Sequence, residues 1–114
     1  MTSTVSIEYT DTFRKQLYNR FQYLARQLGE KAAHELLTGF LDSFENRIAS
    51  HPKSSPLCLE ATDIGLESYH DFIDSKRQLR AVYRIADADK KVYGLLFLST
   101  RQSIREALIQ YCLQ

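Results

Sequence analysis

Two arginines stand four residues apart in the segment QLRAVYRIA (78–86), whose alternation of apolar and polar residues is typical of a β-strand. Arg80 and Arg84 would share one face of this strand, because side chains at i and i+4 point the same way, about 13 Å apart. Both could then contact one extended ligand. Each planar guanidinium can make two charge-assisted hydrogen bonds to a phosphate or carboxylate. The pair therefore indicates an anion-binding surface; the alternative is that it only keeps an open sheet face soluble.

More basic residues surround this segment. Residues 76–105 contain eight lysines and arginines but only two aspartates, a net charge of +6, although the whole chain carries +1. Such a split favours an anionic partner that meets the carboxy-terminal third, whereas chance clustering of solubilising charges is the alternative. The residues that we expect to contact a target are Lys76, Arg77, Arg80, Arg84, Arg101 and Arg105.

Few other residues could carry chemistry. His70 could act as a general base near neutral pH, but among neighbouring carboxylates we expect an ordinary surface histidine. Cys58 and Cys112 are far apart and form no C-x-x-C pair, so they are expected to be buried thiols. No cysteine and histidine residues have metal-ligand spacing. The sequence therefore predicts neither a metal nor a cofactor.

The amino-terminal half predicts a strand followed by two helices. Residues 4–10 alternate like a half-buried strand, and Thr10, Asp11 and Thr12 offer caps for a helix that Gly29 would end. A second helix should run from there to His51-Pro52. Their apolar stripes are Phe13, Leu17, Phe21, Leu24 and Leu28, then Ala33, Leu36, Leu37, Phe40, Leu41, Phe44 and Ile48. The short turn predicts an antiparallel helical hairpin, which needs a sheet beneath it.

The carboxy-terminal half predicts a loop (53–65), three strands (66–73, 78–86 and 92–99) and a last helix. Short polar turns favour an antiparallel meander, and the third, nearly apolar strand suits a central position. Ser103 and Glu106 form a capping box before a stripe of Ile104, Ala107, Leu108 and Tyr111, so Tyr111 is expected to be buried. We predict one α+β domain (1–114) of order β-α-α-β-β-β-α, with the helical hairpin packed on a small, mainly antiparallel sheet.

The chain carries no signal for a membrane. It has no run of about 18 apolar residues, and its amino terminus shows no basic stretch followed by an apolar one. Composition is ordinary for a soluble globular protein, at 44% hydrophobic and 25% charged residues. We therefore expect a cytoplasmic protein.

The element order and two segments resemble the RelE/ParE superfamily of bacterial toxins. These segments are YHDFIDSKRQLRAVYRI (69–85) and VYGLLFLSTRQSIREAL (92–108). The resemblance in architecture covers nearly the whole chain, and the sharper resemblance in motifs covers about residues 69–111. It implies the toxin half of a type II toxin–antitoxin module, with a cognate antitoxin as partner and roles in plasmid stabilisation and growth arrest.

The resemblance implies one of two activities. RelE-type toxins cleave mRNA in the ribosome. For that activity Arg80 matches the strand arginine of the family's site and Arg101 matches its basic residue after the last strand, and both would stabilise charge on the phosphate. Arg84 or Lys76 would position the substrate. ParE-type toxins instead inhibit DNA gyrase and are not enzymes. Ala107 and Leu108 stand where RelE-type toxins often carry a tyrosine or histidine, and a net charge of +1 is low for a ribosome-directed toxin. These departures favour the gyrase inhibitor; the alternatives are the endoribonuclease and a non-toxic, partner-binding relative.

Overall fold

The computed structural model describes residues 5–66, 68–86, 88 and 90–112. The predicted order of elements is confirmed, with one short helix added in the expected loop. The elements are β1 (Ser6–Tyr9), α1 (Asp11–Leu28), α2 (Glu30–Ser50), α3 (Leu59–Asp63), β2 (Tyr69–Asp74), β3 (Leu79–Ala86), β4 (Lys91–Ser99) and α4 (Ile104–Cys112). Thr4, the expected start of the first strand, lies outside the described residues.

The two long helices form the predicted hairpin because their ends are encoded locally. The Thr10 hydroxyl accepts a hydrogen bond from the Phe13 N–H (3.1 Å) and so caps the start of α1. Gly29, with φ at 91°, ends α1 and admits a turn after which α2 begins at the next residue. α2 then continues until His51, which precedes Pro52.

The sheet has the strand order β1-β4-β3-β2, so the apolar strand β4 is central as predicted. β2, β3 and β4 form the antiparallel meander, whereas β1 pairs with β4 in parallel, with Ile7 opposite Val92. The register between β3 and β4 shifts after Val82, since Val82 pairs with Leu96 but Tyr83 pairs with Gly94. This irregularity is a β-bulge, a feature that re-aims side chains locally.

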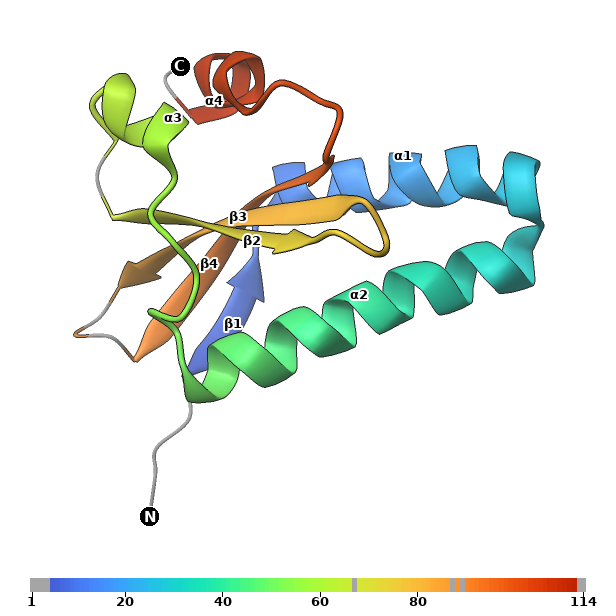
Figure 1. The fold of residues 1–114 in the computed structure, drawn as a ribbon, viewed down its shortest axis with the longest axis horizontal. Helices are drawn as coiled ribbons and strands as arrows, with labels where there is room; N and C mark the ends of the chain where they lie inside the picture. Colours follow the sequence, from blue (N-terminus) through green and yellow to red (C-terminus); the bar gives the residue numbers. More distant parts are fainter. Residues whose placement is uncertain (1–4, 67, 87, 89, 113–114) are drawn as a thin grey trace.

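Both faces of the sheet are covered. Leu79, Ala81 and Tyr83 of β3 pack against the hairpin, where Phe40 and Phe44 are fully buried. The opposite face, with Val82, Leu96 and Leu98, packs against α3 and α4 through Cys58, Ala61, Ile104, Ala107 and Leu108. Figure 1 shows α3 and α4 together on one side of the sheet and α2 on the other. The alternative in which Arg80 and Arg84 only keep an open sheet face soluble is therefore wrong, and the central strand β4 is covered on both faces as expected.

Two further expectations about single residues are wrong. His70 is buried, not on the surface: its Nδ1 lies 2.8 Å from the Ser55 carbonyl oxygen, and its ring stacks on Tyr83. The cause is residues 55–58, which run along the β2 edge and bridge to His70 through Leu57. Tyr111 is 45% exposed, because the described part of α4 buries only Ile104, Ala107 and Leu108. Cys58 is buried as expected, and the Cys112 side chain lies outside the described residues.

No described helix combines the length and the apolar character needed to cross a bilayer. α1 and α2 are long enough, but each presents one apolar stripe to the sheet and polar residues on its other faces.

Candidate functional site

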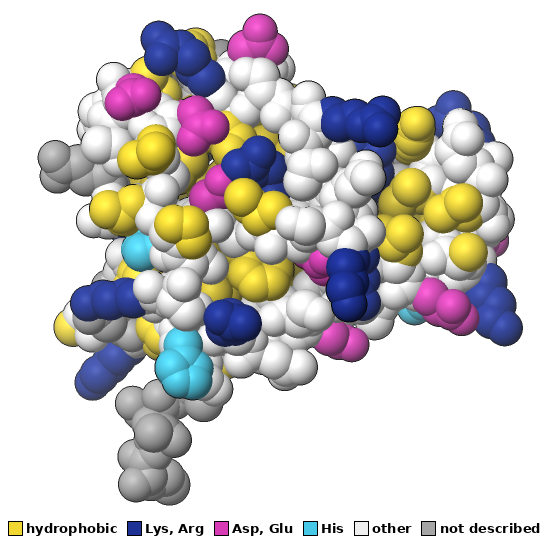
Figure 2. Space-filling view, in the orientation of Figure 1, with side chains coloured by type: hydrophobic (Ala, Val, Ile, Leu, Met, Phe, Trp, Pro, Cys, Tyr) yellow, Lys and Arg dark blue, Asp and Glu magenta, His cyan; other side chains and the backbone are white. Residues whose placement is uncertain are grey.

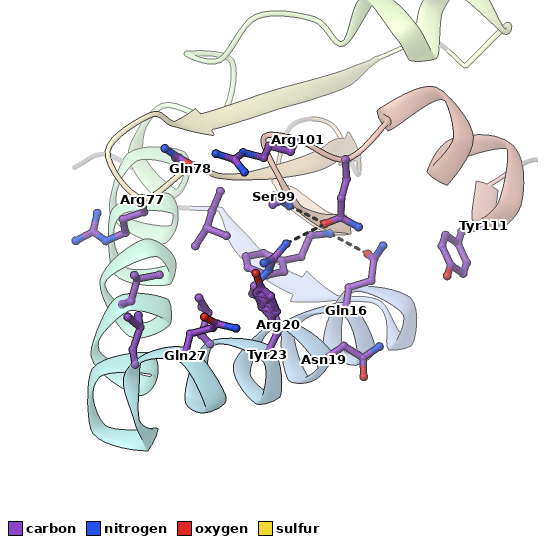
Figure 3. Close-up of a pocket in the computed structure, with 16 residues that line it drawn as sticks. Gln16, Asn19, Arg20, Tyr23, Gln27, Arg77, Gln78, Ser99, Arg101 and Tyr111 are labelled. Carbon is purple, nitrogen blue, oxygen red and sulfur yellow. Dashed lines mark hydrogen bonds between the residues drawn. The ribbon is translucent and has the colours of Figure 1, made fainter.

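A groove with a volume of about 670 Å³ opens where α1 passes the end of the sheet. Its walls come from α1, α2, the β2–β3 turn, the end of β4 and α4, as Figure 3 shows. Cavities of a few hundred to a thousand cubic ångströms are typical of binding sites. The residues that line it are Gln16, Asn19, Arg20, Tyr23, Leu24, Gln27, Leu28, Leu36, Arg77, Gln78, Leu79, Phe97, Ser99, Arg101, Gln102 and Tyr111.

α1 supplies one wall of the groove through residues at helical spacing. Gln16, Arg20, Tyr23 and Gln27 follow one another at steps of four, three and four, so they lie on one face of the helix. Sequence reasoning missed Arg20, although this polar row beside the apolar stripe was a usable signal. The spacing of these residues does not predict that this face of α1 lies against the end of β4.

Two glutamines hold this wall to the sheet. The Gln16 side-chain oxygen accepts a hydrogen bond from the Phe97 N–H at 2.9 Å. The Gln102 side-chain oxygen accepts one from the Ser99 N–H at 2.8 Å and a longer one from Arg20 Nη2 at 3.4 Å. Figure 3 shows these contacts as dashed lines in the middle of the groove. Arg20 is thereby placed beside the segment that carries Arg101.

The charged residues of the groove are all arginines. Among its lining residues, every one of which the structure describes, there is no aspartate or glutamate. Arg101 is exposed and makes no ion pair or hydrogen bond with any described residue. The guanidinium of Arg20 lies 4.9 Å from the centre of the Tyr23 ring, a cation–π contact that leaves its charge uncompensated. The groove therefore presents positive charge to any ligand.

Arg77 lies at the far end of the groove and is held away from its centre. Its Nη1 lies 2.7 Å from Asp74 Oδ2. Burial alone would raise the pKa of Asp74, but hydrogen bonds and charge from Arg77 lower it below its ordinary value. The guanidinium also lies against α2 at Gly39, where a β-carbon would come within 2.5 Å of Arg77 Nη2. Glycine inside this helix thus makes room for the arginine.

Arg80 does not lie in the groove. It makes a two-fold ion pair with Asp71, one contact of which joins Nε and Oδ1 at 3.2 Å, and both side chains are nearly buried, with exposed fractions of 14% and 7%. Burial by itself would lower the pKa of Arg80, but Asp71 and, more weakly, Glu60 raise it above its ordinary value. The structure thus places the predicted strand arginine in a buried ion pair below α3.

The other predicted contact residues also lie outside the groove. The Arg84 guanidinium lies 5.5 Å from the centre of the Tyr93 ring, and Lys76 and Arg105 are exposed. Three basic residues of segment 76–105 form ion pairs with carboxylates from earlier in the chain. Besides Arg77 with Asp74 and Arg80 with Asp71, Lys91 contacts Glu8. Figure 2 accordingly shows basic and acidic side chains interspersed over the visible face. Asp87 and Asp89, which enter the predicted charge, lie outside the described residues.

Comparisons with known proteins concern the fold. The chain matches no family model, and no curated protein matches it. Among solved structures it is similar to a chain of a chromosomal ParDE TA system from P. aeruginosa, with a TM-score of 0.68 and 9% identity over 84% of this chain and 96% of that one. The chain has the RelE/ParE toxin fold. The RelBE2 toxin–antitoxin complex from Mycobacterium tuberculosis is also similar, with a TM-score of 0.59 and 17% identity over 87% of this chain and 94% of that one.

The RelE/ParE fold accounts for the arrangement of the groove. A helical hairpin on one face of the sheet and a carboxy-terminal helix on the other leave an opening at the end of β4, where the chain crosses between them. Arg20, Arg101 and Tyr111 reach this opening from three different elements. Among the described residues no histidine, cysteine and carboxylate side chains gather in a way that could hold a metal ion.

Proposed function

We propose that this chain is the toxin of a type II toxin–antitoxin module, that a cognate antitoxin neutralises it, and that it inhibits DNA gyrase in the manner of ParE. The observation that carries the proposal is the shared fold with a ParDE chain over 84% of this chain. The groove supports it further, because it offers two arginines that no carboxylate among the described residues neutralises. Such a site is suited to capture an acidic surface of a target.

Inhibition by binding, without catalysis, is favoured by the groove's chemistry. Its described lining residues include no histidine, aspartate or glutamate that could serve as a general base. Arg80, the counterpart of the RelE-type strand arginine, forms an ion pair with Asp71 and so does not present a free charge to a phosphate. The net charge of +1 suits a protein target better than a polyanion as large as the ribosome.

One observation favours the alternative, a RelE-like endoribonuclease that acts on ribosome-bound mRNA. Tyr111 of the last helix is exposed and lines the groove with Arg101. In that reaction the ribose 2′-hydroxyl loses its proton to solvent water as its oxygen attacks the adjacent phosphorus, the bond to the 5′-oxygen breaks, and a 2′,3′-cyclic phosphate remains. Arg20 and Arg101 would stabilise charge on the phosphate oxygens, and the Tyr111 hydroxyl would give a proton to the leaving oxygen.

The toxin proposal predicts growth arrest. Expression of this chain alone should stop growth, and co-expression of the neighbouring gene should restore it, because an antitoxin acts by direct binding. The double variant Arg20→Ala/Arg101→Ala should be expressed and folded yet permit growth. Lys15→Ala, on the exposed face of α1 outside the groove, is the matched control and should remain toxic. Normal growth in the presence of soluble wild-type protein would refute toxicity and leave the non-toxic, partner-binding alternative.

Two activity assays distinguish the mechanisms. The purified protein should inhibit DNA supercoiling by gyrase, and Arg101→Ala should weaken that inhibition about tenfold or more, as expected when a charge-assisted contact is lost. Tyr111→Phe should leave it unchanged, because only the hydroxyl is removed. Cleavage of ribosome-bound mRNA that requires the Tyr111 hydroxyl, with gyrase unaffected, would instead establish the endoribonuclease.

A further inference from the structure

The segment between α2 and β2 covers the sheet face that carries Arg80. This segment, residues 52–66, is termed the strap, and the structure describes all of it. It runs along the edge of β2 and then forms α3, which packs beside α4 (Figure 1). Cys58 and Ala61 of the strap lie against Val82 of the sheet. The strap thus helps to keep water from the ion pair of Arg80 with Asp71, whose side chains are nearly buried.

The strap is attached to the sheet mainly through polar contacts along its margin. The Tyr83 hydroxyl donates a hydrogen bond to the Pro52 carbonyl oxygen at 2.6 Å. His70 Nδ1 lies 2.8 Å from the Ser55 carbonyl oxygen. Two backbone hydrogen bonds, of 2.7 and 3.0 Å, join residues 56 and 58 to β2. These contacts determine how firmly the strap is closed.

The apolar contacts of the strap are made by small side chains. Its most buried side chains are those of Cys58 and Ala61, whereas Leu57 and Leu59 are 53% and 70% exposed. Segments that bury little apolar surface open at a lower free energy than the whole domain. Gly65, with φ at 87°, stands at the carboxyl end of the strap and can absorb a change in backbone direction. The strap is therefore suited to open while the sheet stays folded.

Access of water determines how strongly Arg80 is held by Asp71. The attraction between opposite charges is severalfold stronger in a dry interior than at a wet surface, where ions in solution also compete. Both residues belong to the sheet, so neither would move with the strap. Glu60 of α3, which adds negative charge near Arg80, would move with it. Opening would thus allow Arg80 to exchange Asp71 for an external oxyanion.

We propose that the strap opens as a unit, and that in its closed state it withholds Arg80 from oxyanions such as phosphate by excluding water from the pair with Asp71. The closed strap is then an autoinhibitory contact. Phosphate binds only the open form, so phosphate increases the population of that form. The inference goes beyond the proposed function and does not depend on which target the chain binds.

Cys58 reports the opening, because its thiol is buried in the closed state, where burial raises its pKa. Cys112→Ser leaves it as the single cysteine of the chain. Iodoacetamide should alkylate Cys58 in the folded protein, slowly compared with the unfolded chain, as mass spectrometry would show. The rate should depend on urea with less than about a third of the slope for global unfolding, because only the strap becomes exposed. Labelling that requires global unfolding would overturn the proposal.

A weaker attachment should speed this labelling. Tyr83→Phe removes the hydrogen bond to Pro52 and should raise the rate about fivefold, with the same shallow dependence on urea. Tyr18→Phe makes the same change at an exposed position of α1, away from the strap, and should leave the rate unchanged. Equal rates in the two variants would contradict an opening of the whole strap.

Inorganic phosphate tests whether the strap withholds Arg80. At equal ionic strength, phosphate in place of chloride should speed labelling of Cys58 at least about twofold, although phosphate otherwise favours compact states. Asp71→Leu/Arg80→Met should lose this acceleration. If thermal melting shows that variant to be unstable, Arg80→Lys, which lacks the planar fork, replaces it and should show a smaller acceleration. No acceleration, or the same acceleration without the Arg80 guanidinium, would overturn the proposal.

Discussion

Asp71→Ala should lower the free energy of unfolding by about 3–5 kcal/mol, because it leaves the nearly buried Arg80 without its partner. The Arg80 side chain is 14% exposed, so little water can reach it to replace the two contacts that Asp71 makes. Glu60 is close enough to contribute to the charge balance but makes no ion pair with Arg80 in the described part of the chain. Unfolding in urea measures the loss directly.

Two controls separate this effect from ordinary surface electrostatics. Glu8→Ala breaks the contact with Lys91, in which the glutamate is 56% exposed, and should cost no more than about 1 kcal/mol. Asp71→Leu/Arg80→Met removes both charges and should recover most of the stability lost in Asp71→Ala. If Asp71→Ala unfolds at the same urea concentration as the wild type, the ion pair with Asp71 does not stabilise the fold. The Arg80 guanidinium could then leave Asp71 and pair with a ligand at little cost in stability.

The ion pair also determines how Arg80 can be tested for function. A substitution of Arg80 leaves Asp71 buried and unpaired, so loss of activity would arise from instability as easily as from a lost contact. Arg101 is a cleaner probe, because it is exposed and forms no ion pair or hydrogen bond with the described residues. Substitutions at exposed positions of this kind usually change the free energy of unfolding by less than about 0.5 kcal/mol.

Hydrophobic periodicity was sufficient to predict the order of the long elements. The stripes of α1 and α2, Gly29 between them and the short polar turns of the meander each have a local physical cause, so each can be recognised without tertiary information. α3 could not be predicted, because five residues complete little more than one helical turn and show no period. It nonetheless covers the sheet face on which Arg80 lies.

The site was less predictable because it depends on register and on helix rotation. Asp71 stands nine residues before Arg80, and only the pairing of β2 with β3 brings the two side chains together. Arg20 faces the groove because of how α1 lies across the end of β4. The sequence pattern of α4 continued to Tyr111, but the last buried residue in the described part of the helix is Leu108, and Tyr111 is exposed.

Phe40→Ala should also lower the free energy of unfolding by about 3–5 kcal/mol, the usual cost of a large cavity in a core. Phe40 is fully buried, and its ring centre lies 5.4 Å from that of Phe97 and 5.7 Å from that of Phe72. It therefore joins α2 to two strands of the sheet. Such a loss is a large fraction of the stability of a small domain, so the melting temperature should fall clearly.

Phe40→Leu and Tyr18→Ala are the matched controls for this core substitution. Phe40→Leu retains much of the volume and should cost less than Phe40→Ala, whereas Tyr18 is 60% exposed and its replacement should change stability by less than about 0.5 kcal/mol. Phe97 lines the groove, and Phe40→Ala would leave a cavity beside it. At temperatures where this variant remains folded, binding of any ligand in the groove should therefore be weaker. An unchanged melting temperature would mean that Phe40 does not join α2 to the sheet, and the groove would then need another support.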